Sequence, residues 1–102
     1  MTKQNGFLAL RATGVRFLSS GDESAFFAWL KGIGFINQVK GQGKTLFISI
    51  DESLIDEGGV RELLALFRRY DMDMAQLIVF DRDEFADWFR DDRSYWHPYV
   101  FG

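Results

Sequence analysis

The chain has 102 residues and a formal net charge of −3 at pH 7, with 47% apolar and 26% charged residues. This length fits one domain, and the composition is typical of a globular chain rather than a disordered one. Because nonspecific nucleic-acid binding requires clustered lysine and arginine, the acidic balance argues against a nucleic-acid partner. The chain contains no cysteine, which excludes disulfides and thiolate metal sites.

Apolar runs in the sequence are too short to cross a membrane. The run near the start covers residues 7–10, whereas a signal peptide needs an apolar region of about 7–15 residues and a transmembrane helix about 18 or more. The absence of cysteine is compatible with a reducing cytoplasm. We therefore expect a soluble, cytoplasmic protein without a membrane partner.

Residues 6–18 predict the first strand of a sheet. The stretch is rich in strand-forming residues whose side chains alternate between two faces. Gly14 interrupts it and can bend a strand. We therefore expect a strand that bends at this glycine and continues through residues 15–17.

A helix is predicted to follow from Ser20. Ser20 and Glu23 have the capping-box spacing, in which each side chain bonds the backbone N–H of the other residue. Gly32 or Gly34 can adopt the left-handed conformation that commonly ends a helix. The apolar stripe at helical spacing consists of Phe26, Phe27, Trp29, Leu30 and Ile33.

Residues 35–51 predict an antiparallel hairpin. The segment Gly41-Gln42-Gly43 allows the positive φ that a tight turn requires. After it, Leu46, Ile48 and Ile50 alternate with more polar residues. This alternation fits a sheet that has one face against helices.

Two motifs resemble ligand sites but lack required residues. Residues 41–45, Gly-Gln-Gly-Lys-Thr, resemble the end of a phosphate-binding loop, but Gln38 stands where that motif needs glycine, and a strand follows instead of a helix. The pair Asp71 and Asp73 begins like a calcium loop, but its twelfth position is Arg82 rather than glutamate. We therefore expect no cofactor and no metal.

The second strong helix is predicted over residues 58–70, with Leu66 and Tyr70 at the margin of its apolar stripe. Its core positions are Val60, Leu63, Leu64 and Phe67. The next segment, residues 74–80, is compatible with a short helix or a buried strand, and Asp71 or Asp73 could cap a helix there. We favour the helix.

Residues 81–92 predict a further helix rich in acids. Asp81 and Glu84 have capping-box spacing. Three acids four residues apart would form one row on the helix: Asp83, Asp87 and Asp91. Because arginines interleave with them, we interpret the row as a solvated face with ion pairs. An acidic patch for a basic partner and an acid–base pair are the alternatives.

The C-terminal residues 95–101 are unusually aromatic for a chain end. They contain Tyr95, Trp96, Tyr99 and Phe101. Pro98 disfavours helical geometry at His97, and Asp92 or Ser94 should end the preceding helix. We expect most of these rings to be buried, within the monomer or across a dimer, so that they hold the terminus in place.

Together these elements predict a single α+β domain over residues 1–102. Strands joined by a tight turn are antiparallel. An antiparallel sheet of three to four strands, with helices packed on one face and a C-terminal helical and aromatic segment, is the simplest arrangement that buries the apolar stripes.

The second half also carries a resemblance. The segment "RELLALFRRYDMDMAQL", then "WF", then "YWHPYVFG" resembles a group of small bacterial proteins of about this length. The resemblance covers residues 61–102 and implies no activity. Small acidic bacterial proteins of this size are often immunity proteins or antitoxin-like partners, which implies the same class for this chain.

We therefore expect a non-catalytic protein-interaction module, as an immunity-type or antitoxin-like inhibitor. The absence of a catalytic constellation, the acidic balance and the aromatic content of 17% support this expectation. Its partner would be a protein, either a basic toxin or a second copy of the chain. The candidate partner-binding residues are Asp83, Asp87, Trp96, His97 and Tyr99.

Two other functions fit the sequence. One is a small-ligand-binding or enzymatic domain with a cleft near the C-terminal segment, whose acid–base groups would be Asp87, Tyr95 and His97. In that case these three residues should line one pocket. The other is a homo-oligomeric structural protein whose aromatic tail docks on a neighbouring copy.

Overall fold

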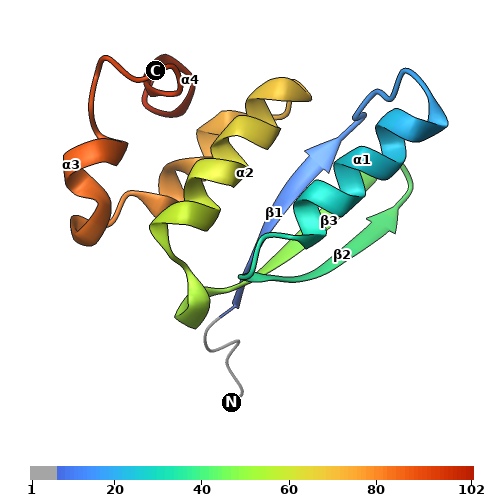
Figure 1. Cartoon of the computed structure of the whole chain (residues 1–102), viewed down its shortest axis with the longest axis horizontal. Helices are drawn as coiled ribbons and strands as arrows, with labels where there is room; N and C mark the ends of the chain where they lie inside the picture. Colours follow the sequence, from blue (N-terminus) through green and yellow to red (C-terminus); the bar gives the residue numbers. More distant parts are fainter. Residues whose placement is uncertain (1–6) are drawn as a thin grey trace.

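Three antiparallel strands form the sheet, in the order β1-β3-β2 (Figure 1). The computed structural model describes residues 7–102. In chain order, with η for a 3₁₀ helix, the elements are β1 (Phe7–Thr13), α1 (Ser20–Lys31), β2 (Ile36–Gln42), β3 (Thr45–Asp51), η1 (Glu52–Leu54), α2 (Glu57–Arg69), η2 (Met74–Phe80), η3 (Asp83–Phe85), α3 (Ala86–Phe89) and α4 (His97–Val100).

The strand order makes the first half a split β-α-β unit. β1 and β2 both run antiparallel to β3, which lies between them. The helices α1 and α2 lie side by side over one face of this sheet (Figure 1). The predicted α+β fold is therefore confirmed, with three strands and with helices on one face.

The first strand is shorter than predicted. β1 ends at Thr13, which pairs with Thr45 at the start of β3. Gly14 then adopts a φ of 68° and donates its N–H to the carbonyl of Lys44 (2.9 Å). Because β3 begins at the level of Thr13, a longer β1 would have no partner strand, and the predicted continuation through residues 15–17 is wrong.

The hairpin forms with a tight turn at Gly43 and Lys44, so Gly43 lies in the turn as expected, whereas Gly41 and Gln42 belong to β2. Of the two turn residues, only Gly43 has a positive φ, 62°, which is the pattern of a type II′ turn. The predicted alternation along β3 is confirmed, because Ile48 and Ile50 are fully buried. On the opposite face Phe47 pairs with Arg11 and Lys40 of the flanking strands.

The caps of α1 differ from the prediction. Ser19 is the N-cap and accepts the N–H of Asp22 (3.1 Å), and the Asp22 carboxylate in turn accepts the N–H of Leu18 (2.8 Å). The capping pair therefore lies one residue before the predicted Ser20–Glu23. At the other end Gly32 has a φ of −77°, so the expected left-handed glycine stop is absent, and its N–H bonds back to Ala28 (3.0 Å).

Helix α2 is the central element of the core. Asp56 caps it by accepting the N–H of Gly59 (2.9 Å), and every predicted core position is fully buried. Leu66 was expected at the margin but is also fully buried. The reason is that α2 contacts two elements, α1 and η2, so that more than one side of the helix is covered. The helix ends in a Schellman motif: Met72 donates its N–H to the carbonyl of Phe67 (2.9 Å), and Asp71 adopts a φ of 55°.

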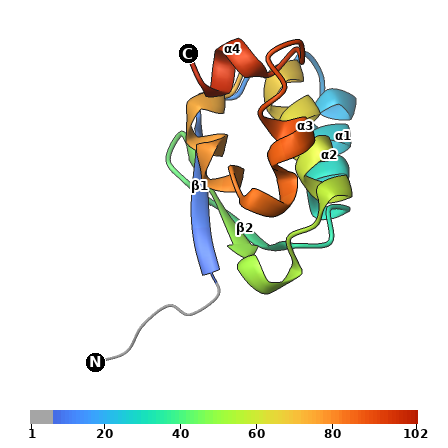
Figure 2. The same ribbon diagram turned by 90° about the vertical axis from the view of Figure 1, so that its left-hand side faces the viewer.

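Residues 74–80 are helical, as favoured, in the form of the 3₁₀ helix η2. Asp73 caps it by accepting the N–H of Ala75 (3.1 Å). The side chain of Gln76 reaches the outer edge of β1, where it bonds the backbone of Arg11. Figure 2 shows the C-terminal elements gathered against α2 on the β1 side of the molecule.

The acidic helix is shorter than predicted. Asp81 does not cap it; its carboxylate accepts from the guanidinium of Arg90 (2.6 Å). η3 and α3 together end at Phe89, so the predicted row of acids on one helix does not continue to Asp91. The predicted extended geometry at His97 is also wrong, because His97 begins α4 and its carbonyl accepts the N–H of Phe101 (2.8 Å).

Candidate functional site

The C-terminal segment, residues 95–101, is partly core and partly surface. Trp96 and Val100 are each only 6% exposed, and Phe101 packs against the core. Tyr95 and Tyr99 are each 48% exposed. The expectation that most of the rings are buried is therefore not met within one copy of the chain: Trp96 is buried, Phe101 is partly buried, and the two tyrosines are exposed.

Trp96 anchors this segment. Its indole N–H donates to the carbonyl of Phe89 (2.8 Å) at a buried site. Its ring lies 6.5 Å from that of Phe89 in a stacked arrangement and 5.9 Å from that of Trp88 in an edge-on arrangement. Because the Trp96 ring is buried and its N–H is hydrogen-bonded, this side chain attaches the segment to the core. Tyr95, which precedes it, and Tyr99, three residues later, therefore extend from an anchored stretch of backbone.

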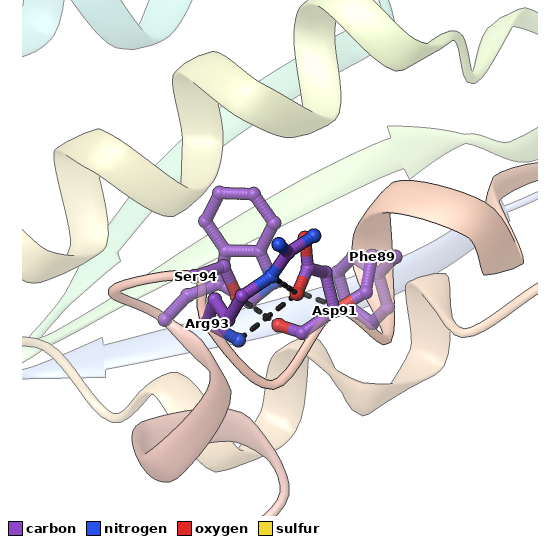
Figure 3. A network of polar contacts seen from close by, with 5 residues as sticks. Phe89, Asp91, Arg93 and Ser94 are labelled. Carbon is purple, nitrogen blue, oxygen red and sulfur yellow. Dashed lines mark hydrogen bonds and ion pairs between the residues drawn. The ribbon is translucent and has the colours of Figure 1, made fainter.

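A turn stabilised by polar contacts connects α3 to the C-terminal segment (Figure 3). The Asp91 carboxylate accepts the backbone N–H of Arg93 (3.0 Å) and its Nε (3.1 Å), and the Ser94 hydroxyl donates to the Asp91 carbonyl (2.7 Å). Hydrogen bonding from Arg93 lowers the pKa of Asp91 below its ordinary value. The contacts with Arg93 therefore favour the ionised form of the Asp91 carboxylate.

Tyr99 lies against an arginine of α2. The guanidinium carbon of Arg68 is 4.6 Å from the centre of the Tyr99 ring, a cation–π distance. One end of α2 shows a similar pairing, in which Arg61 lies 4.4 Å from the centre of the Trp88 ring. Arginine side chains of α2 therefore contact rings that come from the C-terminal third of the chain.

Tyr95 borders a hollow over the outer face of α2. The hollow has a volume of about 570 Å³ and is lined by Ala65, Arg68, Arg69 and Tyr95. Burial in this setting, and then the nearby Glu62 carboxylate, raise the pKa of Tyr95 above its ordinary value. The phenol therefore keeps its proton at neutral pH and can act as a hydrogen-bond donor.

The acids of residues 81–92 are mostly occupied by neighbouring arginines. The ion pairs are Arg82–Glu84 (3.3 Å), Arg90–Asp81 (2.6 Å), Arg90–Asp83 (3.7 Å) and Arg93–Asp91 (3.1 Å). Among residues 7–102, Arg68 and Arg69 form no ion pair. The interpretation of the acidic row as an ion-paired face therefore agrees with the geometry, whereas the two adjacent arginines Arg68 and Arg69 of α2 have no ion-pair partner among the described residues.

The chain matches no protein-family model, no curated protein and no solved structure. Function must therefore be argued from the geometry of its own side chains. Within residues 7–102, no helix has the length and apolar character needed to cross a membrane.

The five residues predicted to bind a partner do not form one surface. Asp83 is fully exposed next to Arg90, and Asp87 and His97 line a shallow hollow of about 670 Å³. Tyr99 lines a different hollow, and Trp96 is buried. Of these five, Tyr99 and Trp96 lie against arginines of α2, Tyr99 against Arg68 and Trp96 against Arg61.

The residues proposed for acid–base chemistry are also divided. Asp87 and His97 share one hollow, but Tyr95 lines the hollow over Ala65. Within the described chain, no three histidine or carboxylate side chains are grouped so that they could hold a metal ion. The condition that the enzymatic alternative requires, all three groups in one pocket, is not met.

Sequence reasoning missed Arg68 and Arg69 as site residues. Their position near the end of α2 explained them as charges that favour the helix C-terminus. A signal was present, since Ala65 lies one turn before Arg68 and Arg69 on the polar side of the helix. The sequence alone does not show that Tyr95 folds back over that side.

Proposed function

We propose that this protein is a non-catalytic protein-interaction module. Its binding surface, which we name the Tyr–Arg face, consists of Tyr95, Tyr99, Arg68 and Arg69. The observation that carries the proposal is the exposure of Tyr95 and Tyr99, each 48%, on a segment that the buried side chains of Trp96 and Val100 attach to the core.

The composition of this face supports the proposal. Tyrosine, tryptophan and arginine are the residues most enriched at the energetic centres of protein interfaces. A ring on a fixed backbone loses little conformational entropy when it binds. Arg68 connects the two rings, because it contacts Tyr99 and lines the hollow beside Tyr95.

An immunity-type or antitoxin-like inhibitor acts through such a face by covering a site on its target. We include this class, acting in the cytoplasm, in the proposal. The alternative partner is a second copy of the chain, bound through the same face. Sedimentation of the purified protein distinguishes the two, because self-association through this face gives a dimer that the variant Tyr95→Ala/Tyr99→Ala loses.

Affinity capture from a cell lysate tests the proposal. The bait is the intact chain, compared with Tyr95→Ala/Tyr99→Ala and with the control Leu18→Ala/Leu54→Ala, which truncates two exposed apolar side chains elsewhere. We expect a specific partner to be retained by the wild type and the control and lost by the tyrosine variant. Equal retention by all three baits contradicts the proposal. Deleting the segment is a poorer test, because Trp96 and Val100 belong to the core.

A further inference from the structure

The hollow over Ala65 has the features of a site for a carboxylate. Its floor is the small side chain of Ala65, and its walls are Arg68, Arg69 and Tyr95. Two guanidinium groups and a phenol together offer many hydrogen-bond donors, and a guanidinium matches the two oxygens of a carboxylate in a forked geometry. No acidic side chain lines this hollow.

In the part of the chain that the structure describes, the acids near this hollow form no ion pair with Arg68 or Arg69. Glu62 lies close enough to Tyr95 to influence it, but its carboxylate accepts the indole N–H of Trp29 (2.8 Å). Asp71 and Asp73 line the separate hollow on the Tyr99 side of Arg68, and within the described residues neither forms an ion pair with an arginine. Within the described residues, Arg68 and Arg69 therefore keep their guanidinium groups free of any internal ion pair.

We propose that the Tyr–Arg face recognises an acidic segment of its protein partner, with one carboxylate seated over Ala65 between Arg68, Arg69 and Tyr95. This inference rests on the proposed function and gives it a partner chemistry. It reverses the charge expected from the sequence, where Asp83 and Asp87 suggested a basic partner. The expected partner charge changes because of the ion pairs within the molecule. Most acids of residues 81–92 pair with arginines of the same chain, whereas Arg68 and Arg69 form no ion pair among residues 7–102.

A peptide segment fits this site better than a nucleic acid does. Binding of a nucleic-acid strand requires a positive groove that follows several phosphates. Here two arginines form a local positive site on a chain whose net charge is −3, and Arg61, which lies one helical turn before Ala65, already pairs with Glu57. The chemistry is therefore that of a single carboxylate contact flanked by rings.

Titration of the ¹⁵N-labelled protein with a blocked hexaglutamate peptide tests the inference. We expect amide shifts confined to Ala65, Arg68, Arg69 and Tyr95, and binding that weakens as salt is added. Arg68→Gln/Arg69→Gln should weaken binding about tenfold or more, since it removes both charged donors. The matched control Arg11→Gln/Arg16→Gln makes the same change in net charge away from the face and should retain binding.

Two further measurements keep the outcomes distinct. Tyr95→Phe removes only the hydroxyl and should weaken hexaglutamate binding less than the arginine variant does. Shifts that are absent, spread over the surface or unchanged in Arg68→Gln/Arg69→Gln overturn the inference, as does stronger binding of an oligothymidylate at the same hollow. If a captured partner nevertheless depends on Tyr95 and Tyr99, the interaction proposal stands and only its acidic chemistry is refuted.

Discussion

The side-chain amide of Gln76 forms with the backbone of Arg11 the two hydrogen bonds that a neighbouring strand would form. The Arg11 N–H donates to Oε1 (2.8 Å), and Nε2 donates to the Arg11 carbonyl (2.7 Å). Because Arg11 lies on the outer edge of β1, this contact covers part of an edge that could otherwise pair with another chain.

Gln76→Ala should therefore destabilise the fold. Each lost hydrogen bond costs about 1 kcal/mol, so we expect a decrease of about 1–2 kcal/mol in the free energy of unfolding. Urea denaturation measures it. Gln38→Ala on exposed β2 is the control and should change the value by less than about 0.5 kcal/mol. Equal effects of the two substitutions contradict the role given to Gln76.

Trp96→Ala should be far more damaging than Tyr99→Ala. Trp96 is buried and hydrogen-bonded, and truncation of a buried aromatic ring costs about 3–5 kcal/mol. Tyr99 is half exposed, so its truncation should cost about 1 kcal/mol or less. Thermal unfolding of both variants and of a chain lacking residues 95–102 checks this. A melting temperature unchanged by that deletion means that the segment does not hold the core together.

Elements with strong periodicity were predictable from the sequence. The alternation of Ile48 and Ile50 along β3 and the stripe from Val60 to Phe67 on α2 each require only local spacing, and both are buried as expected. Cap positions were less predictable. Ser19 and Ser20 are chemically identical, and which one takes the extended N-cap geometry depends on Asp22 and Leu18 around it.

The site was less predictable than the fold because it depends on contacts between distant segments. The acids of residues 81–92 form an obvious cluster in the sequence, but whether they are free depends on the arginines that reach them in space, as Arg90 reaches Asp81. Likewise, Arg68 becomes a candidate site residue only because it lies against the ring of Tyr99. No local sequence pattern predicts that contact. Pairing thus decides which charges are available to a partner.

Asp71 offers a test in which a substitution should stabilise the protein. Its φ of 55° lies in the left-handed region, which costs a non-glycine residue about 1 kcal/mol. Asp71→Gly should raise the free energy of unfolding by about 0.5–1 kcal/mol. Asp73→Gly is the matched change two residues on, and it should destabilise, because it removes the cap of η2. Chemical denaturation that finds Asp71→Gly destabilising would show that the carboxylate itself stabilises the turn.

Asp91 should make the stability of the protein depend on acid pH. The hydrogen bonds from Arg93 lower the pKa of Asp91 in the folded state, so its contribution is present above the unfolded pKa of about 3.9. That contribution is lost as the pH falls below this value and through the folded pKa, because the unfolded chain takes up the proton first. Denaturant midpoints measured between pH 7 and pH 2 should therefore fall less steeply for Asp91→Asn than for the wild type.

The partner side of this contact provides the control. Arg93→Gln removes the guanidinium that lowers the pKa of Asp91 and should flatten the same part of the pH profile, whereas Arg16→Gln, on an exposed loop, should leave the wild-type slope. An Arg93→Gln profile that coincides with the wild type would mean that the turn after α3 does not depend on this pair. The position of Tyr95 would then be maintained by the hydrogen bonds of Trp96 and of the Ser94 hydroxyl.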